Sequence, residues 1–276
     1  MASKIGYLGP PGTFGEQAAL RYDPQAELMP LTSNAAVVFA VAGGDVEIGV
    51  APVENSLEGA VNDTLDALLQ AENVRIRDEL VIPVEQCLVA AGGTRIEDIE
   101  VVISHTSALG QCRGFLEANL PRARLEAALS TAGAVEAAVR TPRAAALGTR
   151  RAAELYGAEV LAAGVQDVKR NKTRFIVVSL RDAARTGDDK TSIAFTVAHD
   201  RPGTLIGVLK ELAERGINLT RIESRPSRQE LGIYIFLLDF QGHQSDATVA
   251  EALAMVKAKA HYFRLLGSYP RFKGEN

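Results

Sequence analysis

The stretch EIGVAPVENSLEGAVNDTLDALLQ (47–70) carries the pattern that decides the fold. Its first part, EIGVAPV (47–53), is a short apolar, β-branched run of the kind that forms a buried strand. In its last part, 59–70, apolar residues recur three and four positions apart, which is the period of an amphipathic helix. A strand followed closely by a helix is the repeating unit of α/β proteins, so this stretch predicts an α/β layer.

The same alternation extends over the first 180 residues. The other predicted strands are 5–8, 81–91, 100–104 and 174–180, and the other predicted helices are 13–22, 34–42, 107–119 and 131–139. We therefore expect α/β layers around largely parallel sheets. The polar run RDAARTGDDK (181–190) has no apolar period and is predicted to be a linker.

The order of elements changes after this linker. The apolar periods predict, in chain order, a strand (191–198), a helix (203–215), two strands joined by a turn at Pro226 (217–225 and 231–240), a helix (247–259) and a strand (262–269). The order βαββαβ over about 80 residues predicts a ferredoxin-like α+β sandwich.

Composition excludes several classes of protein. The chain has 276 residues, enough for about two domains. A net charge of −4 without a block of Lys and Arg argues against a nucleic-acid partner. Cys87 and Cys112 lack CxxC spacing, and the four histidines lack HExxH pairing, so we expect a reduced cytoplasmic protein with no metal site. No apolar run has the length of a signal peptide or a membrane span, so we expect no membrane partner.

Hydroxyl residues stand at the starts of several predicted helices that follow strands: Thr13, Ser33, Ser56, Ser107 and Thr131. Helix N-termini that gather beyond the carboxyl ends of strands present free N–H groups and partial positive charge to a ligand. A single hydroxyl can simply cap its own helix, as Thr13 would in a capping box with Glu16. As a set, these residues predict a cleft that binds a small anion.

A nucleotide site is disfavoured by the glycine spacing near the N-terminus. The segment GPPGTFGE (9–16) reads GxxGxxG instead of GxGxxG, and its two prolines remove N–H groups that a pyrophosphate would use.

Four short polar clusters are candidates for the chemistry: PVENSLEG (52–59), SHTSALGQC (104–112), LSTAGAV (129–135) and NKTRF (171–175). They offer hydroxyls, carboxamides, one arginine and one histidine, and no GxSxG elbow accompanies them. This set suits the binding of a polyanion and the donation of one proton. His105 taken alone fits a structural histidine bonded to the backbone as well as a catalytic one.

Five motifs in this order, YLGPPGTFGEQA, APVENSLEGAV, SHTSALGQC, STAGAV and NKTRFIVV, resemble the prephenate dehydratase family. The segment RPGTLIGVLKELAERGINLTRIESRP (201–226) is similar to the ACT regulatory domain attached to that enzyme. The resemblance implies a lyase of phenylalanine biosynthesis that converts prephenate to phenylpyruvate with loss of water and CO2. It also implies a monofunctional form, because no chorismate-mutase-like helical stretch precedes the motifs, and it implies no cofactor.

The resemblance further implies how the chain is organised. The catalytic domain (1–185) would resemble a type II periplasmic-binding protein, with one lobe of about 1–78 plus 165–182 and the other of 79–164. The ACT domain (190–272) would bind phenylalanine as an allosteric effector, and the enzyme would be a cytoplasmic homodimer or homotetramer.

Family motifs also imply the site residues. The catalytic set is Thr173, Asn55, Ser104, Gln111 and His105, with Thr173 as proton donor or hydrogen-bond donor to the leaving group. The substrate-binding set is Thr13, Glu54, Ser56, Ser130, Thr131, Asn171, Arg174 and Phe175. The effector-binding set is Gly203, Thr204, Leu205, Asn218, Leu219, Glu223, Ser224, Arg225 and Pro226. Arg174 would hold a carboxylate, or it would face away from Thr173 because neighbours on a strand alternate.

The chain departs from the family pattern at two places. Thr106 and Ser107 replace the Pro and Gln of the common SHPQALxQC motif, and Thr204 replaces an alanine. Three other functions stay open: an arogenate dehydratase, a non-enzymatic amino-acid or solute-binding protein with the same cleft, and a redox enzyme acting on prephenate. The last would need NAD, for which the dinucleotide fingerprint is missing.

Overall fold

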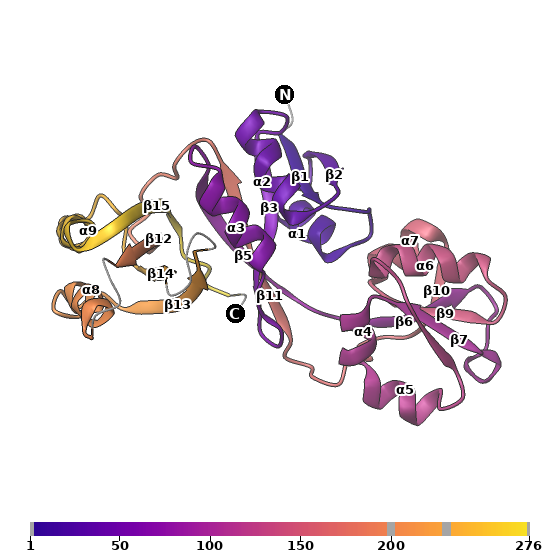
Figure 1. Ribbon diagram of the computed structural model, residues 1–276. Coiled ribbons are helices and arrows are strands. Elements are labelled where there is room, and N and C mark those ends of the chain that lie inside the picture. The colour runs from indigo at the N-terminus through magenta and orange to yellow at the C-terminus, as the bar shows by residue number, and fades with distance from the viewer. Residues whose placement is uncertain (1–2, 198–201, 228–232, 275–276) are drawn as a thin grey trace. The chain divides into compact units, whose positions relative to one another are not determined.

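The computed structural model describes residues 3–197, 202–227 and 233–274. These residues form three β-sheets with helices packed against them (Figure 1). The chain divides into two compact units, residues 1–65 with 80–175, and residues 66–79 with 176–276. No helix in the described ranges is long and apolar enough to cross a bilayer.

The first sheet has the strand order β2-β1-β3-β11-β5, with the short β4 paired to β3. Its strands are β1 (Lys4–Leu8), β2 (Glu27–Leu31), β3 (Ile48–Asn55), β4 (Gly59–Ala60), β5 (Arg75–Pro83) and β11 (Lys172–Ser179). The helices that follow its first strands are α1 (Phe14–Tyr22), α2 (Asn34–Gly43) and α3 (Asn62–Gln70). Strand β1 pairs in parallel with both β2 and β3, which places the carboxyl ends of these strands at one edge.

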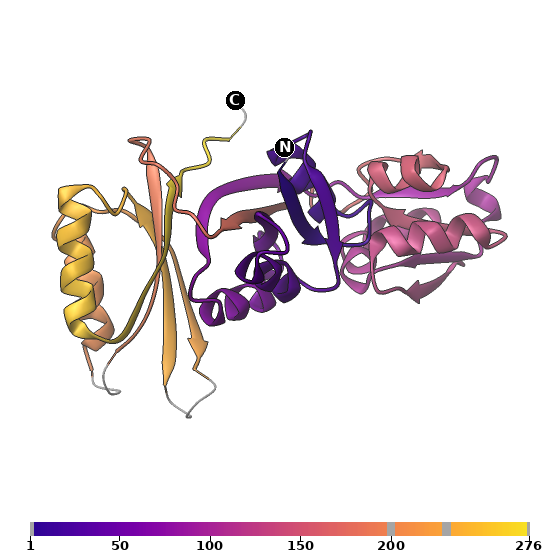
Figure 2. The ribbon, with the colours of Figure 1, turned by 90° about the horizontal axis from the view of Figure 1, so that it is seen from above.

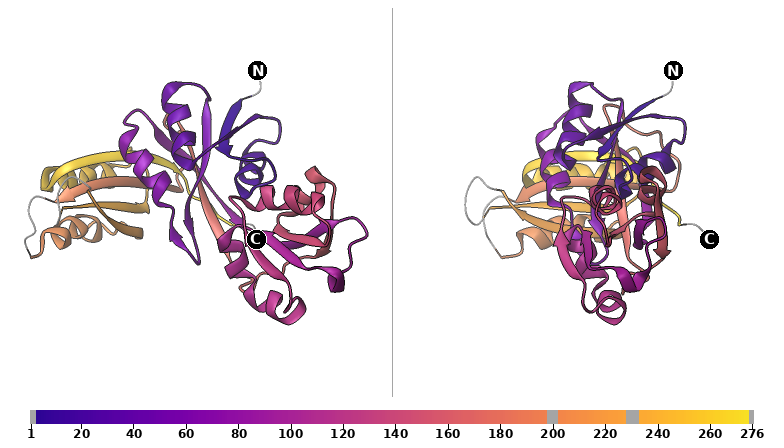
Figure 3. Two further views of the ribbon diagram at one scale, coloured as in Figure 1. Left: turned by 45° about the vertical axis from the view of Figure 1, so that its right-hand side comes forward. Right: turned by 90° about the vertical axis from the view of Figure 1, so that its right-hand side faces the viewer.

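The second sheet has the order β10-β6-β9-β7-β8. Its strands are β6 (Cys87–Ala91), β7 (Val101–Ser104), β8 (Arg124–Ala127), β9 (Ala144–Gly148) and β10 (Ala158–Ala162), and its helices are η1 (Ile96–Asp98), α4 (Thr106–Gln111), α5 (Arg113–Asn119), α6 (Thr131–Arg140) and α7 (Arg150–Tyr156). Helices α6 and α7 lie on one side of this sheet and α4 and α5 on the other (Figures 1 and 3).

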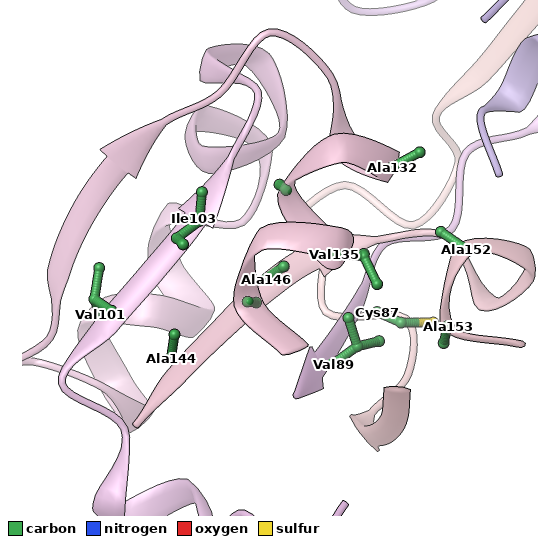
Figure 4. Close-up of a cluster of buried hydrophobic side chains, with 12 residues drawn as sticks. Cys87, Val89, Val101, Ile103, Ala132, Val135, Ala144, Ala146, Ala152 and Ala153 are labelled. Atoms are coloured by element: carbon green, nitrogen blue, oxygen red, sulfur yellow. The ribbon is translucent and has the colours of Figure 1, made fainter. Parts of the chain in front are cut away.

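Alternation along the strands builds a separate core on each side of this sheet. Val89 and Ile103 pack with the α6 residue Val135 in one cluster (Figure 4). Leu88 and Val102 pack with α4 and α5 residues in the other. Because successive strand residues point to opposite faces, one central strand serves both cores.

The chain passes between the two sheets twice, through residues 84–86 and again through 163–171. The stretch 81–91, expected as one strand, is therefore two strands in different sheets. Two sheets joined by two crossings form the expected two-lobed α/β fold of type II periplasmic-binding proteins. Two helix boundaries also differ from expectation: α3 starts at Asn62 because 59–60 forms β4, and the helix expected over 107–119 breaks at Cys112 into α4 and α5.

The third sheet confirms the predicted ferredoxin-like sandwich. Strands β12 (Asp189–Val197), β13 (Leu219–Pro226), β14 (Tyr234–Gln241) and β15 (Ala260–Pro270) pair antiparallel in the order β13-β14-β12-β15. Helices α8 (Thr204–Ala213) and α9 (Ala247–Lys259) pack on one face of this sheet (Figure 2). Pro226 ends β13 instead of centring a turn. The expected strand ends at Ala198 and at 231–232 lie outside the described residues.

Residues 66–79 belong to the same compact unit as this sheet and contact it closely. The Nζ atom of Lys190 lies 2.7 and 2.9 Å from the two carboxylate oxygens of Glu79. A Cβ atom added to Gly267 would lie 2.1 Å from the carbonyl oxygen of Ile76, so only glycine fits at that position. Residues 66–79 are thus joined to the third sheet by an ion pair and by close packing of the two main chains at Ile76 and Gly267.

Candidate active site

A cavity of about 750 Å³ opens within the first unit, between the carboxyl ends of β1 and β3 and the helix starts of the second sheet. This volume suits a small organic molecule. Seven of the predicted site residues line it: Thr13, Asn55, His105, Gln111, Ser130, Thr131 and Thr173.

Asn55 and Thr173 form the central contact of the cavity. Nδ2 of Asn55 donates hydrogen bonds of 2.9 Å to Oγ1 of Thr173 and 3.0 Å to Oδ1 of Asn171. Its Oδ1 accepts from the backbone N–H groups of Leu57 and Glu58 at 2.9 and 3.0 Å. These partners determine which terminal atom of the Asn55 carboxamide is the nitrogen and which is the oxygen. Because Oγ1 of Thr173 accepts from Asn55, the hydroxyl hydrogen of Thr173 is available to a molecule in the cavity.

Ser56 and Asn171 hold the start of β11 against the end of β3. Oγ of Ser56 donates to Oδ1 of Asn171 (3.1 Å) and accepts from the backbone N–H of Lys172 (3.0 Å). Asn171 is 1% exposed, and neither residue lines the cavity. Ser56 was expected at a helix start, but it lies in the turn between β3 and β4 instead.

The N-termini of α1 and α6 lie at the cavity as expected, but the hydrogen bonds that cap these helices differ in part from those predicted. Thr13 caps α1, accepting from the N–H of Glu16 at 3.4 Å. The capping box is shifted, because the Glu16 carboxylate accepts from Gly12 at 2.6 Å instead of from Thr13. Ser130, and not Thr131, caps α6. Neutral hydroxyls and helix N-termini therefore face the cavity.

His105 caps α4, where Ser107 was the expected capping residue. Its Nδ1 accepts from the backbone N–H of Ser107 at 3.3 Å and lies 3.0 Å from Ser107 Oγ. Since Nδ1 is the acceptor, the ring hydrogen of the neutral imidazole is assigned to Nε2. The side chain is exposed at the cavity wall instead of buried, but its bond to the backbone is the one expected of a structural histidine.

Gln111, at the end of α4, contacts a residue that sequence motifs did not single out. Its Nε2 donates to Oε1 of Glu58 at 2.7 Å, while its own Oε1 is buried without a partner. Cys112 follows directly, but burial raises the pKa of its thiol to about 12, so it is not a nucleophile near neutral pH.

Several predicted site residues do not line the cavity. Ser104 is fully buried and donates to the carbonyl of Leu147 at 2.7 Å. Arg174 pairs with Glu54 at 3.8 Å, and Phe175 is 2% exposed. Thr173 faces the cavity and Arg174 does not, which is the alternation expected of strand neighbours.

Charge in the cavity is sparse. Among the described residues that line it, none is Lys or Arg, and Glu58 is the one carboxylate. An anion would therefore be held by neutral donors and helix N-termini. The motifs also missed Thr32 and Gln86 in the lining. No group of three His, Cys, Asp or Glu side chains in the described ranges could hold a metal ion.

The predicted effector residues lie in the second unit, at two places. Gly203, with φ of +88°, precedes α8, which starts with Thr204 and Leu205. The remaining predicted effector residues lie on or just before β13: Asn218, Leu219, Glu223, Ser224, Arg225 and Pro226. Two of them form ion pairs. Arg225 pairs with Asp66 at 3.0 Å, and Glu223 lies 3.6 Å from Arg221.

A two-lobed α/β fold with a cavity of neutral donors and helix N-termini defines a protein that takes a small anionic molecule. The prephenate dehydratase family matches residues 5–183, and the ACT domain family matches residues 191–254. The chain belongs to the prephenate dehydratase family of lyases and carries an ACT domain, as its motifs predicted.

Two relatives that are named prephenate dehydratase agree with this assignment, and a third similar structure is named as an acylase. Prephenate dehydratase of Amycolatopsis methanolica is 41% identical over 276 residues, covering 99% of this chain and 90% of the relative. The structure of prephenate dehydratase from Arthrobacter aurescens in complex with L-Phe has a TM-score of 0.91 and 37% identity, covering 97% of this chain and 90% of that one. The structure of a quorum-quenching acylase has a TM-score of 0.87 and 30% identity, covering 98% of each chain.

Proposed function

We propose that this chain converts prephenate to phenylpyruvate, CO2 and water, in the cavity that contains Asn55 and Thr173. Membership of the family supports this reaction. The observation that carries the proposal is the 2.9 Å hydrogen bond from Asn55 to Thr173, which leaves the threonine hydroxyl able to donate into a cavity whose described lining contains no Lys or Arg.

The reaction needs little more than correctly placed hydrogen bonds. The electron pair of the bond to the ring carboxylate moves into the ring as CO2 leaves, and the hydroxyl on the opposite carbon departs. The dianion takes up one proton and yields phenylpyruvate monoanion, CO2 and water. Thr173 donates to the departing oxygen as the C–O bond breaks, because a threonine hydroxyl is too weak an acid to protonate it beforehand.

Neutral groups suit the ring carboxylate, which must lose its charge in the reaction. A cationic partner would stabilise that carboxylate in the bound substrate more than in the transition state. Thr13, Ser130 and Thr131 hold the anionic ends of the substrate at the N-termini of α1 and α6. Gln111 and His105 complete the wall.

The remaining predicted residues support the site from behind. Ser56 and Asn171 fix the loop that carries Asn55, and Ser104 fixes the end of β7. Glu54 and Arg174 pair with each other, and Phe175 is buried two positions after Thr173 on β11.

Regulation and assembly complete the proposal. Residues 1–185 form the catalytic domain, with lobes of about 1–78 plus 165–182 and of 79–164, and residues 190–272 form the regulatory domain. Phenylalanine binds at Gly203 and along β13, as an ACT domain and a relative solved with L-Phe support. The enzyme works as a homodimer or homotetramer in the cytoplasm, where its free cysteines stay reduced.

The deciding experiment is turnover by the purified chain without added cofactor. Prephenate should yield phenylpyruvate, and phenylalanine should slow that turnover. Arogenate, offered in parallel, tests the neighbouring dehydratase activity. A folded protein that binds prephenate in calorimetry without converting it would overturn the proposal in favour of a binding protein.

A second candidate function is hydrolysis of an acyl amide. The acylase of similar fold favours it, and so does the distance of 3.0 Å between Nδ1 of His105 and Oγ of Ser107 in the cavity wall. A base beside a hydroxyl is the arrangement of acyl transfer. The same Nδ1 also caps α4, however, which competes with that role. Release of free acid from an acyl amide, lost in Ser107→Ala, would establish this activity.

A further inference from the structure

The loop of residues 9–13, between β1 and α1 of the first sheet, is bonded to a residue of the second sheet. Oγ1 of Thr149 donates a hydrogen bond of 2.6 Å to the carbonyl oxygen of Gly12, across 137 positions of sequence. Thr149 directly follows β9 and is 1% exposed. A hydrogen bond shielded from water is stronger than an exposed one, so this bond fixes the Gly12 carbonyl in place.

Further contacts hold the same loop against the helices of the second sheet. Gly12 has φ of +92°, and a Cβ atom added to it would lie 2.9 Å from Cβ of Ala152 on α7 and 3.3 Å from Cβ of Ala132 on α6. The hydroxyl of Tyr156, at the end of α7, donates to the carbonyl of Pro11 at 3.4 Å. The main chain of the loop therefore lies directly on α7.

The N–H of Gly12 is bonded to the helix that follows the loop. It donates to Oε2 of Glu16 on α1 at 2.6 Å, and Glu16 is 6% exposed. The same carboxylate oxygen lies 3.7 Å from Nε of Arg151 on α7. Both polar groups of the Gly12 backbone are therefore held, one by α1 and one by the residue before α7.

Residues on either side of Gly12 line the cavity, and Thr149 does not. The lining residues of this segment are Pro10, Pro11, Thr13 and Phe14. We propose that Thr149 is a positioning residue for prephenate, which holds the loop so that Thr13 and the start of α1 meet the anionic substrate. This inference rests on the proposed function of the cavity.

The hydrogen bond from Thr149 should act on substrate binding and not on the chemical step. A loosened loop lowers the fraction of molecules that are ready to bind, and the apparent dissociation constant rises by the inverse of that fraction. At saturating prephenate the bound substrate selects the ready conformation, so kcat holds. A role in stability alone would instead leave fewer folded molecules, which lowers kcat at an unchanged KM.

The test is steady-state kinetics of Thr149→Val, which keeps the shape of the side chain and removes its hydroxyl. We expect KM for prephenate, measured without phenylalanine, to rise about tenfold while kcat stays within about twofold of wild type. Thr149→Ser keeps the hydroxyl and should restore KM. An unchanged KM in Thr149→Val, or a lower kcat at an unchanged KM, would overturn the inference.

Thr191→Val is the matched control. Oγ1 of Thr191 also donates at 2.6 Å to a glycine carbonyl, that of Gly242, and Thr191 is fully buried in the second unit. Each of the two hydroxyls has a second partner, the N–H of Ala152 for Thr149 at 2.9 Å and Oγ of Ser268 for Thr191 at 2.8 Å. Thr191→Val should therefore lose similar stability and keep KM. An equal rise of KM in both variants would overturn the inference.

Amide hydrogen exchange tests the bond without turnover, and it separates the loop from the cap that Thr149 provides to α7. In Thr149→Val the segment 9–14 should exchange faster than in wild type. Faster exchange confined to 150–156 would show that only the cap was lost, and would overturn the inference. A wild-type protein that does not convert prephenate would reject the proposed function instead, and exchange would still decide whether Thr149 holds the loop.

Discussion

The carboxamide of Asn55 donates a hydrogen bond to the hydroxyl oxygen of Thr173 at 2.9 Å, across 118 positions of sequence. A hydroxyl that accepts a hydrogen bond becomes a better donor, because the two bonds polarise each other. The geometry therefore strengthens the hydroxyl that we propose donates to the leaving group. Asn55 in turn cannot rotate away, since its oxygen accepts two backbone N–H groups.

Thr173→Ala should lower kcat for prephenate by about 10²- to 10⁴-fold, the usual size of a lost proton-transfer contact. Thr173→Ser keeps the hydroxyl and should retain most of the activity. Steady-state kinetics measures both, and calorimetry should show prephenate still binding to the alanine variant. Near-normal turnover by Thr173→Ala would remove this hydroxyl from the mechanism.

Glu58→Gln should lower KM for prephenate about fivefold, because it removes the one carboxylate that repels a dianion in the cavity lining. The new amide oxygen can still accept from Gln111, so kcat should hold. Glu58→Ala loses that acceptor as well and should reduce kcat by releasing Gln111. Glu97→Gln, an exposed change, is the control. An unchanged KM in Glu58→Gln would show that the substrate does not sense this charge.

Lys190→Met should lower the free energy of unfolding by about 3 kcal/mol, because it leaves Glu79 buried without its cation. The Glu79 side chain is 2% exposed and that of Lys190 is 12% exposed. Removing both charges, in Lys190→Met with Glu79→Leu, should cost less than the sum of the single changes. Glu117→Gln, in an exposed pair with Arg113, should cost at most about 0.5 kcal/mol. Urea unfolding measures all four, and additive single changes would contradict the coupling.

Asp189 should make stability depend on pH in the acid range. Burial alone raises the pKa of Asp189, but donors from the Thr186 hydroxyl and the backbone N–H groups of Gly187 and Thr186 outweigh it and bring the pKa below 3.8. At a pH between the folded-state pKa and the unfolded-state pKa of 3.8, the Asp189 side chain is protonated more in the unfolded chain than in the folded one. The stability that Asp189 contributes is therefore complete above pH 3.8, and it is lost as the pH falls through the lowered folded-state pKa. From pH 5 downward, the free energy of unfolding should fall less steeply with pH in Asp189→Asn than in the wild-type protein. An identical slope would show that the carboxylate is not stabilised in the folded state.

Much of the fold could be predicted from periodicity, and the missed strands have physical reasons. Strands β2, β8 and β10 lie at sheet edges, where burial is incomplete and the apolar pattern is weak. Pro30 in β2 is tolerated because an edge strand need not donate on both sides. Strand β9 reads AAALG, and alanine has low strand propensity even though every residue of β9 is buried.

The candidate site could be predicted from family motifs and from hydroxyl residues at helix starts, of which Thr13, Ser107 and Thr131 line the cavity. Family motifs brought Asn55 and Thr173 to attention, and the structure brings the two into contact. Gln86 escaped because none of the motifs contains it, although Pro83, Glu85 and Gln86 interrupt the apolar run 81–91 where the chain leaves one sheet for the other. Glu58 escaped because its partner Gln111 lies 53 positions away, a distance that no local period reveals.

The contact of residues 66–79 with the third sheet determines where the chain can be truncated without loss of stability. A chain ended at residue 185 retains Glu79, Asp66 and Ile76 but loses Lys190, Arg225 and the backbone at Gly267 that meet them. Such a fragment would expose the carboxylate of Glu79 and the backbone of Ile76 to solvent, both of which are covered in the whole chain. The ACT domain is therefore not a detachable module, and exchanging it between relatives requires exchanging residues 66–79 with it.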